Sequence, residues 1–149
     1  MKNISALMEI FPIVQKLLLN TIDLHSITLT RAQILILFAL SGKDSLNMSQ
    51  IATYLASSKE QATRAVAPLV KEDYVSRFHK ENNRKKVYIC LTEKGVNFIH
   101  QEKQLIRSKL SDQFNALSLD DQMTFQTAVD DILHILKKLD YQNIQGDKK

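Results

Sequence analysis

Residues 51–66 read IATYLASSKEQATRAV, a pattern typical of two short helices joined by a turn. Two residue pairs in it fit the capping box, in which a serine and a Glu or Gln three positions later satisfy each other's free backbone amides: Ser57 with Glu60 and Ser58 with Gln61. Either pair can start a helix over about residues 59–71. The apolar residues before the serines predict a short helix over 48–55, so the stretch predicts two helices joined by a tight turn.

After these helices the sequence pattern changes from helical to strand-like. Tyr74–His79 and Val87–Leu91 are rich in β-branched and aromatic residues, which favour strands. They flank the polar stretch Lys80–Lys86, so the region predicts a β-hairpin with a basic tip. Two helices joined by a turn and followed by such a hairpin make the winged helix-turn-helix arrangement.

The remaining segments predict further helices, and therefore a mainly α fold with one small β-hairpin as its wing. Only three Gly and two Pro interrupt the chain. The segment ILILFAL is apolar nearly all round and predicts a buried central helix. The expected helices are 4–25, kinked at Pro12; 31–40, capped by Thr30 and ended by Ser41 and Gly42; 48–55, capped by Asn47; 93–115, capped by Thr92; and one that starts at Ser118, with a loose polar tail after Gln142.

The composition fits one soluble globular domain, with 149 residues of which 44% are hydrophobic and 24% charged. A single cysteine, Cys90, excludes an intramolecular disulfide and suits a reducing compartment. The longest uninterrupted apolar run, Ile34–Leu40, is far shorter than the ~20 residues that span a bilayer, and the N-terminus lacks the pattern of a secretory signal. We therefore expect a cytoplasmic protein without a transmembrane segment.

The positive charge of the chain is concentrated in its middle. Twenty Lys and Arg against sixteen Asp and Glu give a net charge of +4. Between Lys43 and Gly95 there are ten bases and six acids, so this segment carries the whole excess and the rest of the chain is neutral. An anionic partner is therefore expected to bind the predicted winged helix.

The helix over 58–71 and the wing over 80–86 carry the candidate contacts to double-stranded DNA. On the helix, Gln61 can pair bidentately with adenine, and Arg64 or Lys59 with guanine. On the wing, Arg84 is the candidate for insertion into a narrow minor groove. The complete set of candidate DNA-binding residues is Ser57, Ser58, Lys59, Gln61, Thr63, Arg64, Arg77, Lys80, Arg84, Lys85 and Lys86.

Each of these features also has a purely structural interpretation. An amphipathic surface helix with a solvated charged face gives the pattern of residues 59–71, and charge at a hairpin tip serves solubility. The capped turn, the polar helix and the basic hairpin together are what docking on a duplex requires, which favours DNA binding.

Candidates for catalysis or metal binding are few. His25, His79, His100 and His134 form no pair at metal-binding spacing on one helical face, and Cys90 lies in an alternating strand where a packed thiol is expected. The sequence has no nucleophile elbow, phosphate-binding glycine loop or paired carboxylates. It therefore predicts no enzyme, metal site or cofactor.

The sequence resembles the multiple-antibiotic-resistance repressor (MarR) family of bacterial winged-helix regulators. The motifs that carry the resemblance are Leu29-Thr30-Arg31-Ala32-Gln33, Ser49-Gln50-Ile51-Ala52, Ser58 through Thr63-Arg64, Leu91-Thr92-Glu93-Lys94-Gly95 and Leu117-Ser118-Leu119-Asp120-Asp121. The resemblance implies a homodimer on a pseudo-palindromic operator, and a small effector, often aromatic, that weakens DNA binding. We expect residues 1–28 and 104–149 to form the dimerisation region and 29–103 the DNA-binding region.

Three positions depart from the pattern of the family. The usual Asp-Arg-Arg of the wing reads Asn83-Arg84-Lys85, which keeps the inserting arginine but replaces by an amide the acid that steadies the wing. The usual Gly at the end of the recognition helix is Asp73. Pro68 lies in the last turns of that helix and is expected to shorten or bend it.

Two functions from different classes follow from these patterns. The favoured one is a dimeric, sequence-specific DNA-binding transcriptional regulator, in the form of a ligand-responsive repressor. The alternative is a winged-helix protein-interaction module that binds an acidic protein partner without reading bases.

Overall fold

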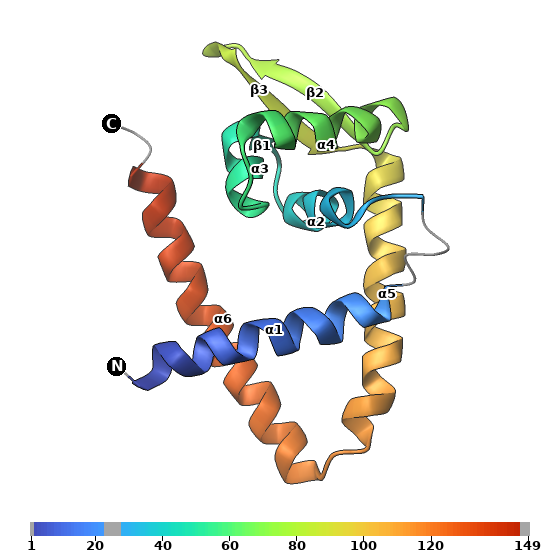
Figure 1. The fold of residues 1–149 in the computed structure, drawn as a ribbon, viewed down its shortest axis with the longest axis vertical. Helices are drawn as coiled ribbons and strands as arrows, with labels where there is room; N and C mark the ends of the chain where they lie inside the picture. Colours follow the sequence, from blue (N-terminus) through green and yellow to red (C-terminus); the bar gives the residue numbers. More distant parts are fainter. Residues whose placement is uncertain (1, 23–27, 147–149) are drawn as a thin grey trace. The chain divides into compact units, whose positions relative to one another are not determined.

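A computed structural model of the chain describes residues 2–22 and 28–146 (Figure 1). The described part divides into two compact units, residues 1–107 and 108–149, with the boundary inside α5. The fold is mainly helical with one small sheet, as predicted. Its elements are α1 Lys2–Thr21, α2 Arg31–Leu40, β1 Leu46–Asn47, α3 Met48–Tyr54, α4 Lys59–Lys71, β2 Val75–Lys80, β3 Asn83–Leu91, α5 Glu93–Asn115 and α6 Leu119–Gly146.

Three successive helices of the first unit begin with a complete capping box. Thr30 with Gln33 caps α2, and Asn47 with Gln50 caps α3, as the sequence predicts for both N-caps. For α4 the structure decides between the two predicted serines: the Ser58 hydroxyl accepts from the Gln61 amide, and the Gln61 side-chain carbonyl accepts from the Ser58 amide. Each box satisfies amides that a helix start leaves unpaired, so the helix starts are fixed locally.

The hydrophobic core of the first unit is built around α2. Ile36, Leu37 and Leu40 of this helix have no exposed surface, which confirms the predicted central helix. The side chains that pack into the same core come from α3, α4, the sheet and α5, and include Ile51, Val66, Leu69, Val75, Ile89 and Ile99. The side-chain amide of Gln33 also donates to the carbonyl of Ala65, which ties α2 to α4.

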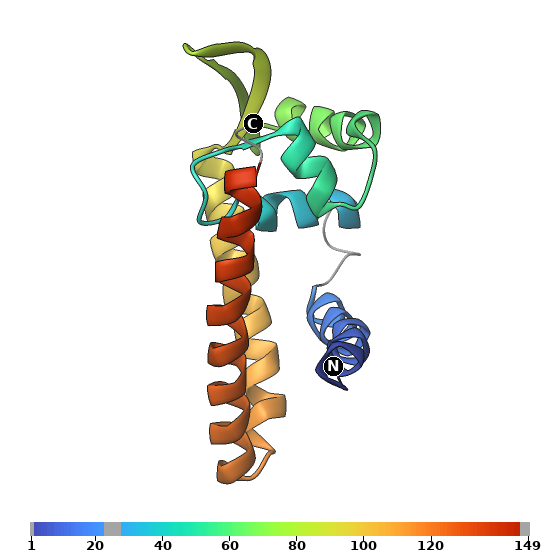
Figure 2. The ribbon, with the colours of Figure 1, turned by 90° about the vertical axis from the view of Figure 1, so that its left-hand side faces the viewer.

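The sheet has three antiparallel strands in the order β1-β3-β2. The strand β1 is absent from the sequence prediction, and it pairs Leu46 with Ile89 so that both side chains enter the core. The predicted hairpin is confirmed, but its connection is shorter than expected because β3 begins at Asn83 rather than Val87. Most of the basic stretch 80–86 is therefore strand, and the hairpin extends beyond α4 in both ribbon views (Figures 1 and 2).

Two helices of the winged helix end at non-glycine residues in the left-handed region. Ala56 after α3 has φ +48° and Asp73 after α4 has φ +61°. Both ends carry the double hydrogen bond of a Schellman motif; after α4, Tyr74 N donates to Leu69 O (2.9 Å) and Asp73 N to Val70 O (3.1 Å). Asp73 thus occupies the conformation for which the family's usual glycine is suited.

The start of α5 is fastened to the end of α4 at one corner. Thr92 N donates to Tyr74 O (3.1 Å), the Thr92 hydroxyl donates to Asp73 O, and Gly95 N donates to that hydroxyl (3.1 Å). A Cβ on Gly95 would lie 2.1 Å from the carbonyl oxygen of Tyr74, so the helix approaches this closely only because residue 95 has no side chain.

Three predictions about helix ends are corrected. The first helix ends at Thr21 and not at His25, which lies outside the described residues. The last helix continues to Gly146, so the stretch after Gln142 is helical rather than loose. Pro68 does not shorten α4, which continues to Lys71. Proline lacks an N–H, so one carbonyl in the preceding turn loses its helical donor, and at an exposed position water can bind that carbonyl instead.

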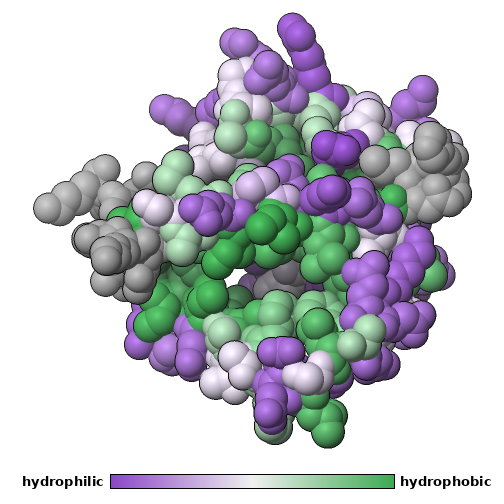
Figure 3. Space-filling model, turned by 60° about the horizontal axis from the view of Figure 1, so that its bottom comes forward, coloured by the Kyte–Doolittle hydropathy of each residue, from purple (hydrophilic) through white to green (hydrophobic). Residues whose placement is uncertain are grey.

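Large apolar side chains remain exposed along α1 and α6. Figure 3 shows hydrophobic side chains at the surface on one face of the molecule. On α1, Met8, Phe11 and Ile13 are each about two-thirds exposed (72%, 67% and 66%). By length and composition alone, the window Ile4–Thr21 (mean hydropathy 1.2) is apolar enough to cross a membrane, although the longest apolar run predicted no such segment. Core helices of soluble proteins and signal sequences pass the same test.

The left-handed backbone at Asp73 generates a stability prediction. We expect Asp73→Gly to raise the free energy of unfolding by about 0.5–1 kcal/mol, because glycine adopts a positive φ without the steric cost of a Cβ. Denaturant unfolding measures the change. Glu72→Gly is the matched control: Glu72 has φ −86°, so glycine there relieves no strain and should lower stability. A loss of stability in Asp73→Gly equal to that of the control would contradict the argument.

Candidate nucleic-acid interface

The helix α4 presents a polar face opposite the face that it buries. Ala62, Val66 and Leu69 point into the core. At 3.6 residues per turn, Glu60 and Arg64 lie on the opposite side of the helix, and both are exposed. The predicted reading face is therefore accessible. Glu60 was not among the predicted contacts, although a carboxylate there can accept from the amino group of cytosine.

Four of the predicted contact residues on this helix and its turn form local hydrogen bonds. Ser58 and Gln61 form the capping box, the Thr63 hydroxyl donates to Lys59 O (2.8 Å), and the half-buried Ser57 donates to Ser58 O (3.3 Å). The Gln61 carbonyl is thus already engaged, which leaves its amino group as the main donor of this side chain. Lys59 and Arg64 are the exposed cations of the first turns of α4.

The hairpin carries all five of the predicted wing contacts at exposed positions: Arg77, Lys80, Arg84, Lys85 and Lys86. A stack of side chains stiffens it, since the Phe78 and Tyr88 rings lie 5.7 Å apart and the Lys80 Nζ lies 4.2 Å from the Tyr88 ring centroid.

A hydrogen bond closes the irregular part of the hairpin. The register shifts between Phe78 and Lys80, and the intervening His79 places its Nδ1 at 3.1 Å from Lys86 O. A carbonyl can only accept, so Nδ1 is the donor. The wing is thus held by strand pairing, ring stacking and this bond, without the acid that Asn83 replaces.

A hollow of about 240 Å³ lies where α3, α4 and β3 meet; we call it the lysine hollow. It brings together three of the predicted contact residues, Lys59, Lys85 and Lys86, from the recognition helix and the wing. Its other lining residues are Asn47, Met48, Ser49 and Val87. Sequence reasoning missed Asn47 and Ser49 as lining residues because their position depends on the pairing of β1 with β3.

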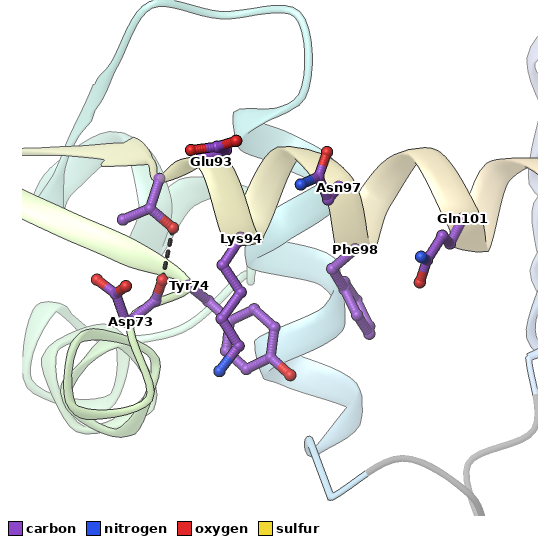
Figure 4. Close-up of a pocket in the computed structure, with 8 residues that line it drawn as sticks. Asp73, Tyr74, Glu93, Lys94, Asn97, Phe98 and Gln101 are labelled. Carbon is purple, nitrogen blue, oxygen red and sulfur yellow. Dashed lines mark hydrogen bonds between the residues drawn. The ribbon is translucent and has the colours of Figure 1, made fainter.

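A larger hollow of about 520 Å³ lies beside the corner where α4 ends and α5 begins (Figure 4). Tyr74 and Phe98 meet there edge to face with ring centroids 5.3 Å apart. Lys94 lies over the Tyr74 ring, with its Nζ at 4.3 Å from the centroid, and donates to Glu72 O (2.6 Å). The rest of the lining is polar and consists of Asp73, Thr92, Glu93, Asn97 and Gln101.

The other candidates for chemistry are dispersed. Among the side chains that the structure describes, no three His, Cys, Asp or Glu residues cluster as metal ligands would. Cys90 is half-buried on β3, and its Sγ lies 3.1 Å from the Ser76 hydroxyl on the neighbouring strand.

Comparison with known proteins agrees with this architecture. Residues 29–87 match the family model described as MarR family. The HTH-type transcriptional regulator PchR of Bacillus subtilis (strain 168) is 25% identical over 99 residues, which are 62% of this chain. The match spans 59% of the length of PchR.

Solved structures share the fold at lower identity. A MarR family protein from Bacillus stearothermophilus has a TM-score of 0.73 at 17% identity, over 91% of this chain and 96% of its own. Wild-type MarR from E. coli, in its apo form, has a TM-score of 0.69 at 23% identity, over 83% and 93%. Streptococcus pneumoniae FabT, solved in complex with DNA, has a TM-score of 0.66 at 17% identity, over 93% and 97%. Residues 29–87 therefore match the MarR family model, and the chain has the fold of the MarR structures.

Proposed function

We propose that this protein is a dimeric, sequence-specific DNA-binding transcriptional regulator. The observation that carries the proposal is the joint presentation, by one MarR family domain, of the exposed polar face of α4 and the basic hairpin β2–β3. The fold shared with FabT, which was solved in complex with DNA, supports it. In this proposal α4, with its cap at residue 58, enters the major groove and the hairpin enters the adjacent minor groove.

Each candidate residue has a proposed role. Arg64 contacts base edges, Gln61 contributes its amino group, and Lys59 contacts the phosphate backbone. Arg84 inserts into the minor groove, where narrow A·T-rich segments concentrate negative potential. The remaining candidates, Ser57, Ser58, Thr63, Arg77, Lys80, Lys85 and Lys86, contact or approach the phosphate backbone.

Dimerisation is proposed from the exposed apolar side chains of α1 and α6. A surface with this many exposed apolar residues is expected to be covered in solution. We propose that residues 1–28 and 104–149 form the dimerisation region and that 29–103 form the DNA-binding region. A two-fold dimer would place its two α4 helices about one turn of DNA apart, ~34 Å, and would read a pseudo-palindromic operator.

We further propose that the protein is a cytoplasmic repressor whose DNA affinity a small molecule lowers. The hollow beside the corner of α4 and α5 supports a coupled response, because Asp73, Tyr74 and Thr92 line it and also fasten α4 to α5. An occupant that moved this corner would move the end of the recognition helix. Tyr74 and Phe98 suit an aromatic effector. We assign no catalytic role, metal or cofactor to the protein.

The second candidate function is a module that binds an acidic protein partner through the same basic face. The two functions differ in base readout. A regulator prefers duplexes selected from a random pool over unselected DNA by at least ~10³ in affinity. An interaction module binds all duplexes alike, so a selection followed by anisotropy titration distinguishes the two.

The wing generates a prediction about electrostatics. We expect Arg84→Ala to weaken binding to a selected duplex and to lower the slope of log affinity against log salt concentration by about 0.9, the contribution of one neutralised phosphate. Anisotropy titrations at several salt concentrations measure both quantities. Lys137→Ala, which removes an exposed charge from α6, is the control and should change neither. An unchanged slope in Arg84→Ala would remove Arg84 from the interface.

The outward face of α4 generates a prediction about base readout. We expect Arg64→Ala to reduce the discrimination between the selected site and single-base variants by about 1–3 kcal/mol at one position of each half-site. Affinities for a set of single-base variants measure this loss. A uniform weakening across all sequences would show that Arg64 contacts phosphate instead.

Gln61 requires a different variant because it also caps α4. Gln61→Glu keeps a side-chain carboxyl oxygen for the Ser58 amide and removes the amino group, whereas alanine would lose the cap as well. We expect Gln61→Glu to keep the unfolding free energy within about 0.5 kcal/mol of wild type while altering base preference. An unchanged base preference in Gln61→Glu would show that Gln61 only caps α4 and does not read bases.

The exposed apolar side chains of α1 and α6 generate a prediction about assembly. Light scattering at micromolar concentration is expected to give twice the chain mass of 17.1 kDa. A variant with Phe11→Glu and Ile13→Glu on α1 is expected to shift this mass toward that of the monomer, because charges in an apolar interface cost several kcal/mol. A monomeric wild type would contradict the two-fold operator model.

A further inference from the structure

The lysine hollow joins the two elements that we propose to contact DNA. Lys59 is the first residue of α4, whereas Lys85 and Lys86 lie on β3, within the wing. They converge only because β3 begins at Asn83, which carries the basic stretch back along the strand toward α3 and α4. The hollow therefore lies between the helix proposed for the major groove and the hairpin proposed for the minor groove.

The chemistry of the hollow is that of an anion site. Its lining includes Lys59 of α4 and Lys85 and Lys86 of β3, together with Ser49 and Asn47. Among the described residues that line it, three are lysines and none is acidic, so the lining itself supplies no negative charge. Gathering like charges around one hollow is unfavourable unless an anion occupies it, and lysines bind phosphate as compact point charges.

The amide of Asn47 is itself held in place, which limits what it can contribute. Its side-chain oxygen accepts from Gln50 N at 2.9 Å in the capping box of α3, so its remaining capacity is the NH₂ donor group. The Ser49 hydroxyl adds a second neutral donor. The hollow thus offers charge and neutral donors to oxygen atoms, which matches a phosphate group better than a planar apolar ligand.

We infer that the lysine hollow binds one backbone phosphodiester of the operator in each half-site. The inference rests on the proposed DNA-binding function and deepens it. The DNA strand that separates the major from the minor groove passes between α4 and the wing, and its phosphates are the anions that this position meets. Because residues of α4 and of the wing bind the same phosphate, the hollow fixes the positions of the recognition helix and the wing along one DNA strand.

The test removes one phosphate charge at a time. Duplexes of a selected operator carry a single uncharged methylphosphonate at successive positions, and each is titrated with the wild type and with the Lys59→Ala, Lys85→Ala double variant. We expect one position per half-site at which the wild type loses about tenfold in affinity and the double variant loses nothing further. The double variant should keep its ranking of single-base operator variants. Lys71→Ala, at the other end of α4, is the matched control and should keep the sensitivity of the wild type.

Equal sensitivity of wild type and double variant at every position would overturn the inference. A separate arm distinguishes a backbone phosphate from free phosphate, and uses inorganic phosphate with the DNA-free protein. If the Ser49 and Lys59 amide resonances shift saturably in the wild type and not in the double variant, the hollow is an anion site by itself. If the protein binds no duplex selectively, the proposed function fails. In that case, saturable shifts of the Ser49 and Lys59 amide resonances would still support an anion site with free phosphate as its ligand, and the absence of these shifts would reject the anion site.

Discussion

The winged helix depends on the complete burial of α2. Because Ile36, Leu37 and Leu40 have no exposed surface, every neighbouring element must supply an apolar face to this helix. For α4 that face consists of Ala62, Val66 and Leu69, so its orientation about its own axis is fixed by the core. The polar side of the recognition helix is therefore turned outward as a consequence of packing, and DNA is not needed to orient it.

The elements that local chemistry controls could be predicted from the sequence, often to the residue. A cap acts on backbone amides three residues away, so Thr30, Asn47 and Ser58 identify the starts of α2, α3 and α4 without knowledge of the rest of the chain. The choice between Ser57 and Ser58 needed the structure, because both pairs have the same spacing. The family resemblance agrees with the fold because its motifs are largely these caps and the residues that follow them.

The elements that depend on distant pairing could not be predicted in the same way. A two-residue strand at Leu46–Asn47 has no pattern of its own and exists because Ile89 and Tyr88 pair with it. The sequence pattern predicts the start of β3 four residues late, because the basic residues 84–86 have low strand propensity. The pairing with β2 and the Phe78–Tyr88 stack override this propensity. The lysine hollow depends on both of these pairings, so the sequence predicts its three lysines singly, but not as one site and not with Asn47 and Ser49.

The extension of β3 through the basic residues bears on the thermodynamics of association. Side chains on paired strands are spaced by ~3.4 Å along a backbone whose torsions are already restricted, in contrast to side chains on a loop. A partner that binds Arg84 and Lys85 therefore does not have to order the polypeptide that carries them, and the conformational entropy lost on binding is confined to the side chains. In this protein, the conformational entropy cost of ordering the wing backbone therefore belongs to folding and not to binding.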